Sequence, residues 1–293
     1  MALTISVASG KGGTGKTAVA TNLARIVARE RDTWLLDCDV EAPNCHLFMK
    51  PEVQKTEDVS IPVPVVDHSK CNSCGICDEV CAFNAIVALS KQTIVFSELC
   101  HGCGACSRFC PNKAITETPV RIGQVDVGRA GAIDFCQGVS GVGVAIVTPV
   151  IRAVKQKVDL AAEDTVVLLD APPGTGCPVV VTVSGSDYCV LVTEPTPFGL
   201  NDLKLAVQLV RHLGIACGVV INRYGLDGGT SDVEAYCQSE RIPVLARIPF
   251  DRKYAASYAR AGNWVDEFPE LEAVFCELWA SILREISPKE DAR

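Results

Sequence analysis

The sequence predicts an α/β protein with a mostly parallel sheet, into which a small α+β domain is inserted. Short apolar strands alternate with stretches of helical periodicity, which is the order of a parallel sheet. Eight of the 16 cysteines fall between Cys71 and Cys110 and interrupt this alternation. With 293 residues, of which 48% are hydrophobic, the chain is long enough for about two domains. A disordered or fibrous protein is excluded.

The N-terminal segment predicts one strand–helix–strand unit. Residues 3–8 are apolar and form the first expected strand, and a glycine-rich turn follows. Residues 15–29 have apolar side chains at helical spacing, and residues 34–37 form a second strand that ends in Asp37. Two strands joined through a helix are parallel, so this unit starts the sheet.

The second half of the chain repeats the pattern. Apolar runs without alternation predict strands covered by helices on both faces of the sheet. The amphipathic stripe at 270–286 has an acidic polar face, which favours packing on the core over contact with a membrane surface. The expected strands are 166–170, 189–193, 218–222 and 244–248, and the expected helices are 146–158, 200–213 and 270–286.

The cysteine-rich block interrupts the α/β pattern between the second and third expected strands. Residues 51–64 contain three prolines and several charges, which predicts a linker. Residues 119–145 are rich in glycine and predict turns or a hairpin. We therefore expect residues 1–60 and 119–293 to form one α/β domain and residues 61–118 to form the inserted domain.

Residues 10–17 match the phosphate-binding pattern G-x-x-x-x-G-K-[ST], between a strand and a helix. Glycines allow backbone N–H groups to surround phosphate oxygens at the positive end of the helix. Lys16 is expected to contact the β- and γ-phosphates, and the Thr17 hydroxyl to bind Mg²⁺. ATP or ADP with Mg²⁺ is the predicted ligand. The expected contacts are Gly10, Lys11, Gly12, Gly13, Thr14, Gly15, Lys16, Thr17 and Ala18.

A second lysine in this loop, Lys11, makes the motif more specific. With it, the chain resembles the deviant Walker A ATPases of the MinD/ParA/Mrp and nitrogenase iron protein superfamily, across nearly all of its length outside the cysteine block. The motifs that carry the resemblance are Lys11, Asp37-Cys38-Asp39, residues 170–176 (Asp-Ala-Pro-Pro-Gly-Thr-Gly), Asn222-Arg223 and Ile248-Pro249-Phe250-Asp251.

The resemblance implies a slow ATPase that works as a nucleotide-dependent homodimer or as a heterodimer with a related ATPase. In such a dimer Lys11 contacts the phosphates bound by the partner subunit. Asp39 orients the attacking water, and Asp170 holds Mg²⁺ through water with Asp37 behind it. Together with Lys16, Lys11 and Asp39 are the expected catalytic residues. The adenine contacts implied by the resemblance are Asn222, Arg223, Pro249, Phe250 and Asp251.

The cysteine block contains two runs of the form C-x₂-C-x₂-C-x₃-C, which is the spacing of bacterial ferredoxins with two 4Fe–4S clusters. In that arrangement the fourth cysteine of each run binds the cluster of the other run. Zinc is the weaker alternative, since the Cys-x₃-Cys part of each run fits four-ligand zinc knuckles less well. The expected ligands are Cys71, Cys74, Cys77 and Cys110 for cluster 1, and Cys81, Cys100, Cys103 and Cys106 for cluster 2.

One cysteine outside the block has a second interpretation. Cys177 lies seven residues after Asp170, where the nitrogenase iron protein has a ligand of a cluster that bridges two subunits. A bridging cluster needs a second ligand from each subunit, and Cys136 is the one loosely plausible candidate. The simpler interpretation is a structural thiol. The C-x-x-C that Mrp-type carriers use near the C-terminus is absent from the sequence.

These motifs predict an ATPase that couples its nucleotide state to electron transfer through two 4Fe–4S clusters. The alternatives are an iron–sulfur assembly or carrier ATPase of Mrp type, and a redox-sensing positioning or regulatory ATPase. The expected partner is a redox protein or an iron–sulfur client. The net charge of −8 argues against binding to nucleic acid. Clustered thiols without a signal-like N-terminus favour the cytoplasm.

Overall fold

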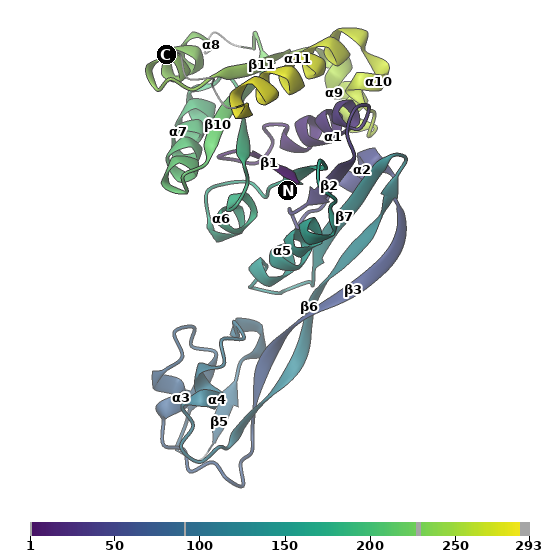
Figure 1. Cartoon of the computed structure of the whole chain (residues 1–293). Coiled ribbons are helices and arrows are strands. Elements are labelled where there is room, and N and C mark those ends of the chain that lie inside the picture. The colour runs from purple at the N-terminus through teal and green to yellow at the C-terminus, as the bar shows by residue number, and fades with distance from the viewer. Residues whose placement is uncertain (1, 91, 227–229, 288–293) are drawn as a thin grey trace.

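The computed structural model describes residues 2–90, 92–226 and 230–287. A sheet with helices on both faces forms the body of the molecule (Figure 1). The cysteine-rich part lies at the far end of a long two-stranded ribbon that leaves one edge of this sheet (Figure 1). In the part of the chain that is described, no helix is both long and apolar enough to span a membrane.

Among the described residues, nine strands form the main sheet, in the order β11-β10-β9-β1-β8-β2-β7-β6-β3. The strands from β11 to β7 run parallel, while β6 and β3 are antiparallel additions at one edge. The mostly parallel α/β fold is therefore confirmed. The bounds are β1 Leu3–Ala8, β2 Thr33–Asp37, β3 Glu52–Val66, β6 Ile115–Ala130, β7 Ile133–Ser140, β8 Val166–Asp170, β9 Tyr188–Thr193, β10 Ala216–Tyr224 and β11 Val244–Pro249.

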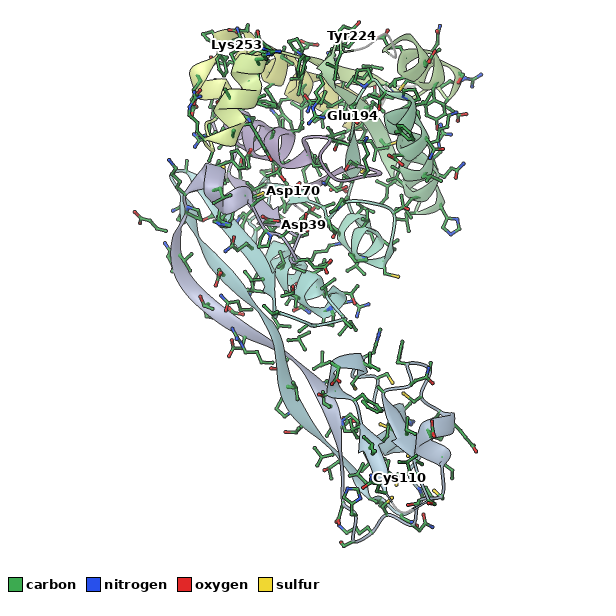
Figure 2. All side chains as sticks on the ribbon, turned by 180° about the vertical axis from the view of Figure 1, so that it is seen from behind. Asp39, Cys110, Asp170, Glu194, Tyr224 and Lys253 are labelled. Carbon is green, nitrogen blue, oxygen red and sulfur yellow. The ribbon has the colours of Figure 1, made fainter. Side chains whose placement is uncertain are left out.

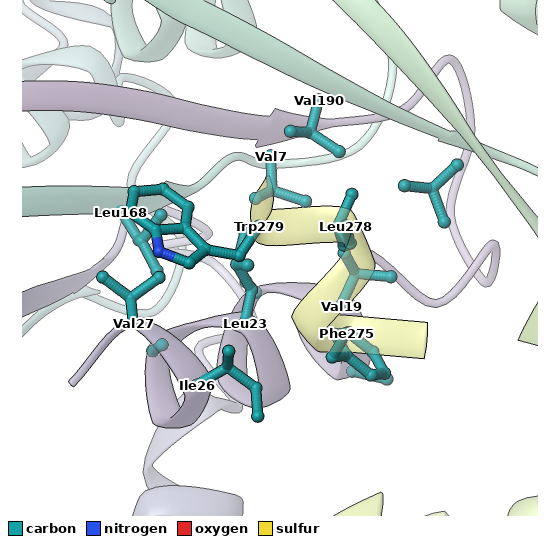
Figure 3. Close-up of a cluster of buried hydrophobic side chains, with 14 of the residues drawn as sticks. Val7, Val19, Leu23, Ile26, Val27, Leu168, Val190, Phe275, Leu278 and Trp279 are labelled. Carbon is teal, nitrogen blue, oxygen red and sulfur yellow. The ribbon is translucent and has the colours of Figure 1, made fainter. Parts of the chain in front are cut away.

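Helices cover both faces of the sheet, as its continuous apolar strands predict. One face packs against α1 (Lys16–Val27), α2 (Cys45–Met49), α9 (Arg252–Ala259), α10 (Trp264–Glu267) and α11 (Pro269–Ile286). The other face packs against α5 (Thr148–Lys155), which a 3₁₀ turn at Gln156–Leu160 extends, and against α6 (Cys177–Val183), α7 (Pro197–His212) and α8 (Thr230–Ser239). The amphipathic C-terminal helix is confirmed as a core element: Phe275, Leu278 and Trp279 pack with Leu23 of α1 (Figure 3).

The expected linker at 51–64 is wrong, because these residues form most of β3. This strand pairs antiparallel with β6 along its length, from Glu52–Arg129 to Val66–Ile115. Pro62 and Pro64 misled the interpretation, since proline usually argues against a strand. β3 is the outermost strand, so prolines there need not donate to a further neighbour. The expected hairpin is confirmed as β6 and β7, which turn at Gly131 with φ +62°.

The ribbon begins where β6 loses its second neighbour. β7 pairs only with the Gly123–Ala130 part of β6, so the remainder of β6 and its partner β3 project from the body. At this point Ile122 is an extra residue of β6, since the paired residues shift from Val59–Gly123 to Ser60–Arg121. The two strands run without a break through the expected boundaries at 60/61 and 118/119.

The described residues of 67–114 connect β3 to β6 at the end of the ribbon, and we call them the cysteine module. It holds two short helices and a two-stranded sheet. Its elements are α3 (Ile76–Glu79), β4 (Ile86–Ala88), β5 (Thr93–Val95), a 3₁₀ turn at Ser97–Leu99 and α4 (Ala105–Arg108).

Candidate functional site

Polar residues gather where the parallel strands of the body end. Asp37 is the last residue of β2 and Asp170 the last of β8, while Glu194 directly follows β9 and Asn222 lies near the end of β10. The carboxyl ends of parallel strands meet at one edge of the sheet, and ligands bind at that edge. The N-terminus of α1 lies at the same edge, so its backbone N–H groups provide a site for anions.

The loop before α1 has a fixed shape that requires glycine at two positions. Gly15 has φ +96°, and a Cβ there would lie 2.3 Å from Nδ2 of Asn222. A Cβ on Gly10 would lie 2.1 Å from the backbone oxygen of Asp202. Asn222 also donates a hydrogen bond through Nδ2 to the Thr14 carbonyl oxygen at 2.7 Å. Asn222 thus fixes the loop through its contacts with Thr14 and Gly15.

A cavity of about 350 Å³ opens beside this loop. It brings together twelve of the residues expected to bind nucleotide or to act on it: Gly12, Gly13, Gly15, Lys16, Thr17, Ala18, Asp39, Asn222, Arg223, Pro249, Phe250 and Asp251. Gly10, Lys11, Thr14, Asp37 and Asp170 do not line it. The last two lie behind the cavity in the interior, where they are fully buried.

The buried carboxylates form a corner next to Thr17. The Thr17 hydroxyl donates to Oδ2 of Asp170 at 2.7 Å, while Oδ1 of Asp170 is buried without a hydrogen-bond partner. Burial raises the pKa of Asp170, because an ion removed from water is disfavoured, although the charge of Lys16 and the hydrogen bond from Thr17 oppose this. Mg²⁺ prefers oxygen ligands, and Asp170 offers one carboxylate oxygen that has no other partner. The residues present therefore fit that ion.

Asp37 holds the backbone next to this corner. Its carboxylate accepts N–H bonds from Asn44 and Cys45, both at 2.9 Å, and from Asp39 at 3.1 Å. Burial, followed by repulsion from Asp170, raises the pKa of Asp37 to about 7. These bonds fix the segment that carries Asp39, which reaches the cavity (Figure 2). Burial also raises the pKa of Asp39, to about 6, although Lys16 opposes this.

Lys11 points away from the cavity in the single chain. It forms an ion pair with Glu194, which is 8% exposed, and Arg223 donates to the same carboxylate at 2.7 Å. Arg223 also donates to the Gly13 carbonyl oxygen at 3.0 Å. The sequence reasoning missed Glu194, which holds both Lys11 and Arg223 at this edge of the sheet. Its place directly after a strand, as for Asp37 and Asp170, was the available signal.

The far wall of the cavity belongs to α9. Asp251 caps this helix by accepting the Lys253 N–H at 2.9 Å, so its carboxylate has a structural role as well. Tyr254 and Tyr258, one helical turn apart, line the cavity together with Trp264. The sequence reasoning missed these rings, although an aromatic pair at i, i+4 after a capping aspartate was visible. Aromatic rings next to Phe250 provide a flat apolar surface for a base.

The cysteine module holds its eight expected ligands in two groups. One hollow is lined by Cys71, Cys74, Cys77 and Cys110, and the other by Cys81, Cys100, Cys103 and Cys106. Each group thus takes three cysteines from one run and the fourth from the other run. All eight are free thiols.

The two runs have matching local geometry. Cys81 accepts an N–H bond from Ala85, and Cys110 accepts one from Ala114, both at 3.3 Å. Gly75 and Gly104 have φ of +85° and +72° and occupy the same position before α3 and α4. Backbone N–H groups directed at sulfur stabilise thiolate charge, so the module suits anionic sulfur ligands.

Cys177 is exposed at the start of α6, whereas Cys136 is fully buried within β7. Cys136 is paired in register with Leu36 of β2 and Val127 of β6. Its side chain is buried against the face of the sheet and does not reach the surface. The burial of Cys136 argues against the weaker interpretation, in which it joins Cys177 as a ligand of a bridging cluster.

Comparison with known proteins shows the family to which this chain belongs. The family described as "CobQ/CobB/MinD/ParA nucleotide binding domain" matches residues 5–263. An uncharacterized protein of Methanocaldococcus jannaschii is 30% identical over 89% of this chain and 91% of its own length. An uncharacterized ATP-binding protein of the same organism is 25% identical over 87% of this chain and 78% of its own length.

The fold is also that of solved structures. The septum site-determining protein MinD of Pyrococcus horikoshii, complexed with Mg-ADP, superposes with a TM-score of 0.61, at 20% identity and 98% coverage of both chains. A chain of the MinC:MinD cell division protein complex from Aquifex aeolicus gives a TM-score of 0.60, at 15% identity and 96% coverage of both chains. The family match spans most of the sequence and includes every strand that ends at the cavity, so this chain belongs to the CobQ/CobB/MinD/ParA family of nucleotide-binding proteins.

Proposed function

We propose that this protein is a slow ATPase whose nucleotide state is coupled to electron transfer through two 4Fe–4S clusters in the cysteine module. The observation that carries the proposal is the joint presence of two separate four-cysteine groups and a nucleotide cavity in one chain, connected by a continuous buried core. The clusters would supply one-electron redox chemistry. The chain's own residues bind nucleotide, hold the clusters and connect the two regions.

The spacing of the thiols supports clusters over zinc. Four sulfurs around one tetrahedral zinc, each at about 2.3 Å from it, lie about 3.8 Å apart. Within the described residues, the one set of three or more His, Cys, Asp or Glu side chains whose ligand atoms all lie within 4.8 Å is Asp37, Cys45 and Asp170. The cysteine groups of the module are wider than that, as ligands at the corners of a larger cluster must be.

The two groups lie in series along the ribbon. The group with Cys100 is next to Pro62 and Glu117, whereas the group with Cys71 is next to Thr93 and Ile115 at the far end. Val66, the partner of Ile115, lies four positions after Pro62 in β3, which corresponds to about 13 Å. The second group is thus the one nearer the body.

A buried core connects this nearer group to the nucleotide cavity. Val40 directly follows Asp39, and its carbonyl oxygen accepts the Ser140 N–H of β7 at 2.8 Å. Val40 belongs to the same hydrophobic cluster as Ile122 and Ile61 of the ribbon and as Cys100 of the module. Close-packed side chains transmit displacement, so a movement of Asp39 when nucleotide binds would reach a cluster ligand.

The nucleotide site supports hydrolysis by position and charge. Phosphoryl transfer requires charge neutralisation and an oriented water, for which Lys16, Thr17 and Asp39 are in place. Lys11 is held by Glu194 in the single chain. We propose that it leaves this partner in a nucleotide-dependent dimer and contacts the phosphates of the other subunit.

An anaerobic EPR redox titration tests the coupling. The reconstituted protein is titrated without nucleotide, with MgADP and with a non-hydrolysable MgATP analogue, and iron is counted in the same sample. We expect about eight irons per chain and a nucleotide-dependent midpoint shift, where ~59 mV for a one-electron couple corresponds to a tenfold change in the linked equilibrium. The Lys16→Ala variant should not show the shift. Identical midpoints in all three states of the parent protein would refute the coupling.

The exposure of Cys74 and Cys103 favours the carrier alternative over a purely structural use of the clusters. These two thiols are the middle ligands of their runs, and a client's thiols can reach exposed ligands directly. A carrier would lose iron to an apo-client protein on mixing, and ATP would change the rate of loss. An electron-transfer protein would keep about eight irons per chain under the same conditions.

A further inference from the structure

The buried corner at the end of β2 and β8 contains a thiol that magnesium binding does not explain. Cys45 is the first residue of α2, and its Sγ donates a hydrogen bond to Oδ2 of Asp170 at 3.3 Å. The ligand atoms of Asp37, Cys45 and Asp170 all lie within 4.8 Å of one another, and all three residues are fully buried. Mg²⁺ binds oxygen and has no use for sulfur.

Free acceptor positions in this corner point to a cation. Oδ1 of Asp170 is buried without a hydrogen-bond partner. Oδ2 of Asp37 accepts two N–H bonds, whereas Oδ1 accepts one and keeps a lone pair. A carboxylate oxygen left unpaired away from water is costly, and a bound cation removes that cost.

We propose that Cys45, Asp170 and Asp37 form a site for a thiophilic divalent cation of the zinc class, in competition with Mg²⁺. Two carboxylates and one thiolate are a three-ligand set that suits zinc. The Thr17 hydroxyl, which donates to Asp170 and lines the cavity, lies between this corner and the nucleotide site. The cation displaces the thiol proton, which passes to solvent. The Cys45 thiol therefore allows the nucleotide site to bind a zinc-class ion as well as Mg²⁺.

This inference rests on the nucleotide and magnesium part of the proposed function and needs neither cluster. A zinc-class ion that contacts both Cys45 and Asp170 occupies the place from which Asp170 would hold Mg²⁺. The nucleotide can then stay bound while the Mg²⁺-dependent step stops. We expect trace amounts of such an ion to slow hydrolysis more than they weaken nucleotide binding.

Cadmium serves as the probe, because its bond to sulfur gives a charge-transfer absorbance that Mg²⁺ does not give. The cluster-loaded full chain is titrated anaerobically with CdCl₂, without nucleotide and with fluorescent ADP. The Cys45→Ser variant keeps the size of the side chain and removes the soft donor. Cys136→Ser is the matched control, since that thiol is equally buried but lies in β7, outside the corner. Iron is counted before and after, so that loss of a cluster is recognised.

The cadmium–sulfur absorbance of the parent protein and of Cys136→Ser should exceed that of Cys45→Ser by the amount for one cadmium–sulfur bond per chain. Half-saturation of ADP binding by Cd²⁺ should rise by about tenfold or more in Cys45→Ser, while half-saturation by Mg²⁺ stays the same. Equal cadmium spectra and equal Cd²⁺ half-saturation in the parent protein and Cys45→Ser would overturn the inference. A parent protein that binds no ADP with either metal would contradict the proposed function instead, and the spectrum without nucleotide would still decide the role of Cys45.

Discussion

The nucleotide end of the sheet and the cysteine module place their functional residues in different ways. The first lies over a large core of β1, α1 and α11, and its polar side chains are held by hydrogen bonds such as that of Asn222 to the loop. The module has a small core of Cys77, Ile86 and Cys106 that packs on Ile115 of β6, and two of these four residues are expected ligands. The first site is thus formed by the fold, whereas we expect the second to depend on bound metal.

The largest expected effect comes from removing the clusters. Since ligand binding supplies folding free energy to small metal domains, the module should lose its structure when iron is chelated under oxidising conditions. Hydrogen exchange should accelerate in residues 67–114 while residues of β1 and α1 stay protected. ADP affinity should remain within about twofold. If the module stayed protected from exchange after complete loss of iron, its structure would not depend on bound metal.

A core substitution in the body should destabilise the body and leave the cysteine module unchanged. Leu23 is fully buried in α1, so Leu23→Ala should lower the free energy of unfolding of the body by about 2–5 kcal/mol. Urea unfolding followed by tryptophan fluorescence measures this loss. The iron content of the folded variant should equal that of the parent. An equal loss of iron would show that the two regions do not hold their structure independently.

The Lys16→Ala variant separates ligand binding from stability. Lys16 lines the cavity and is buried, so its loss removes a positive charge from the wall where we expect the phosphates to bind. We expect ADP affinity to fall by about 100-fold, which corresponds to about 2.8 kcal/mol, while both clusters stay in place. Isothermal calorimetry and the EPR spectrum report the two outcomes on one sample. A variant that keeps its ADP affinity would remove Lys16 from the site.

The smallest effect is expected at Glu194. Burial opposes its ionisation, yet the partners Lys11 and Arg223 outweigh burial and lower the pKa of Glu194 below its usual 4.5. The unfolded chain therefore takes up this proton at higher pH than the folded chain, and the stabilisation is lost as the pH falls below about 4.5. Glu194→Gln should cost about 1 kcal/mol at pH 7, since Lys11 and Arg223 are partly exposed.

Urea unfolding of the parent and of Glu194→Gln, from about pH 7 down to about pH 4, measures this contribution. The difference between the two proteins should shrink over the acid part of the range. A difference that grows toward acid would mean that the charged form of Glu194 does not stabilise the fold.

Local chemistry made part of this molecule predictable. The loop at 10–17 and the two cysteine runs are continuous patterns, and the structure groups their residues as the spacing indicates. The β3–β6 ribbon was not predictable, because Pro62 and Pro64 are tolerated only when a strand has a free edge, which is a tertiary property. Cys45 was missed for a related reason, since only the folded sheet brings it to Asp170.

The extra residue Ile122 lies where the ribbon leaves the sheet. A residue of this kind bends a strand pair and tightens its twist, so one position sets the direction in which the module is carried. Side chains alternate along each strand, so changes in ribbon length come in steps of two residues per strand, each about 6.6 Å. The distance of the module from the body can therefore change by two residues per strand without any change in the nucleotide site. A change of one residue would move each side chain of the ribbon to the opposite face.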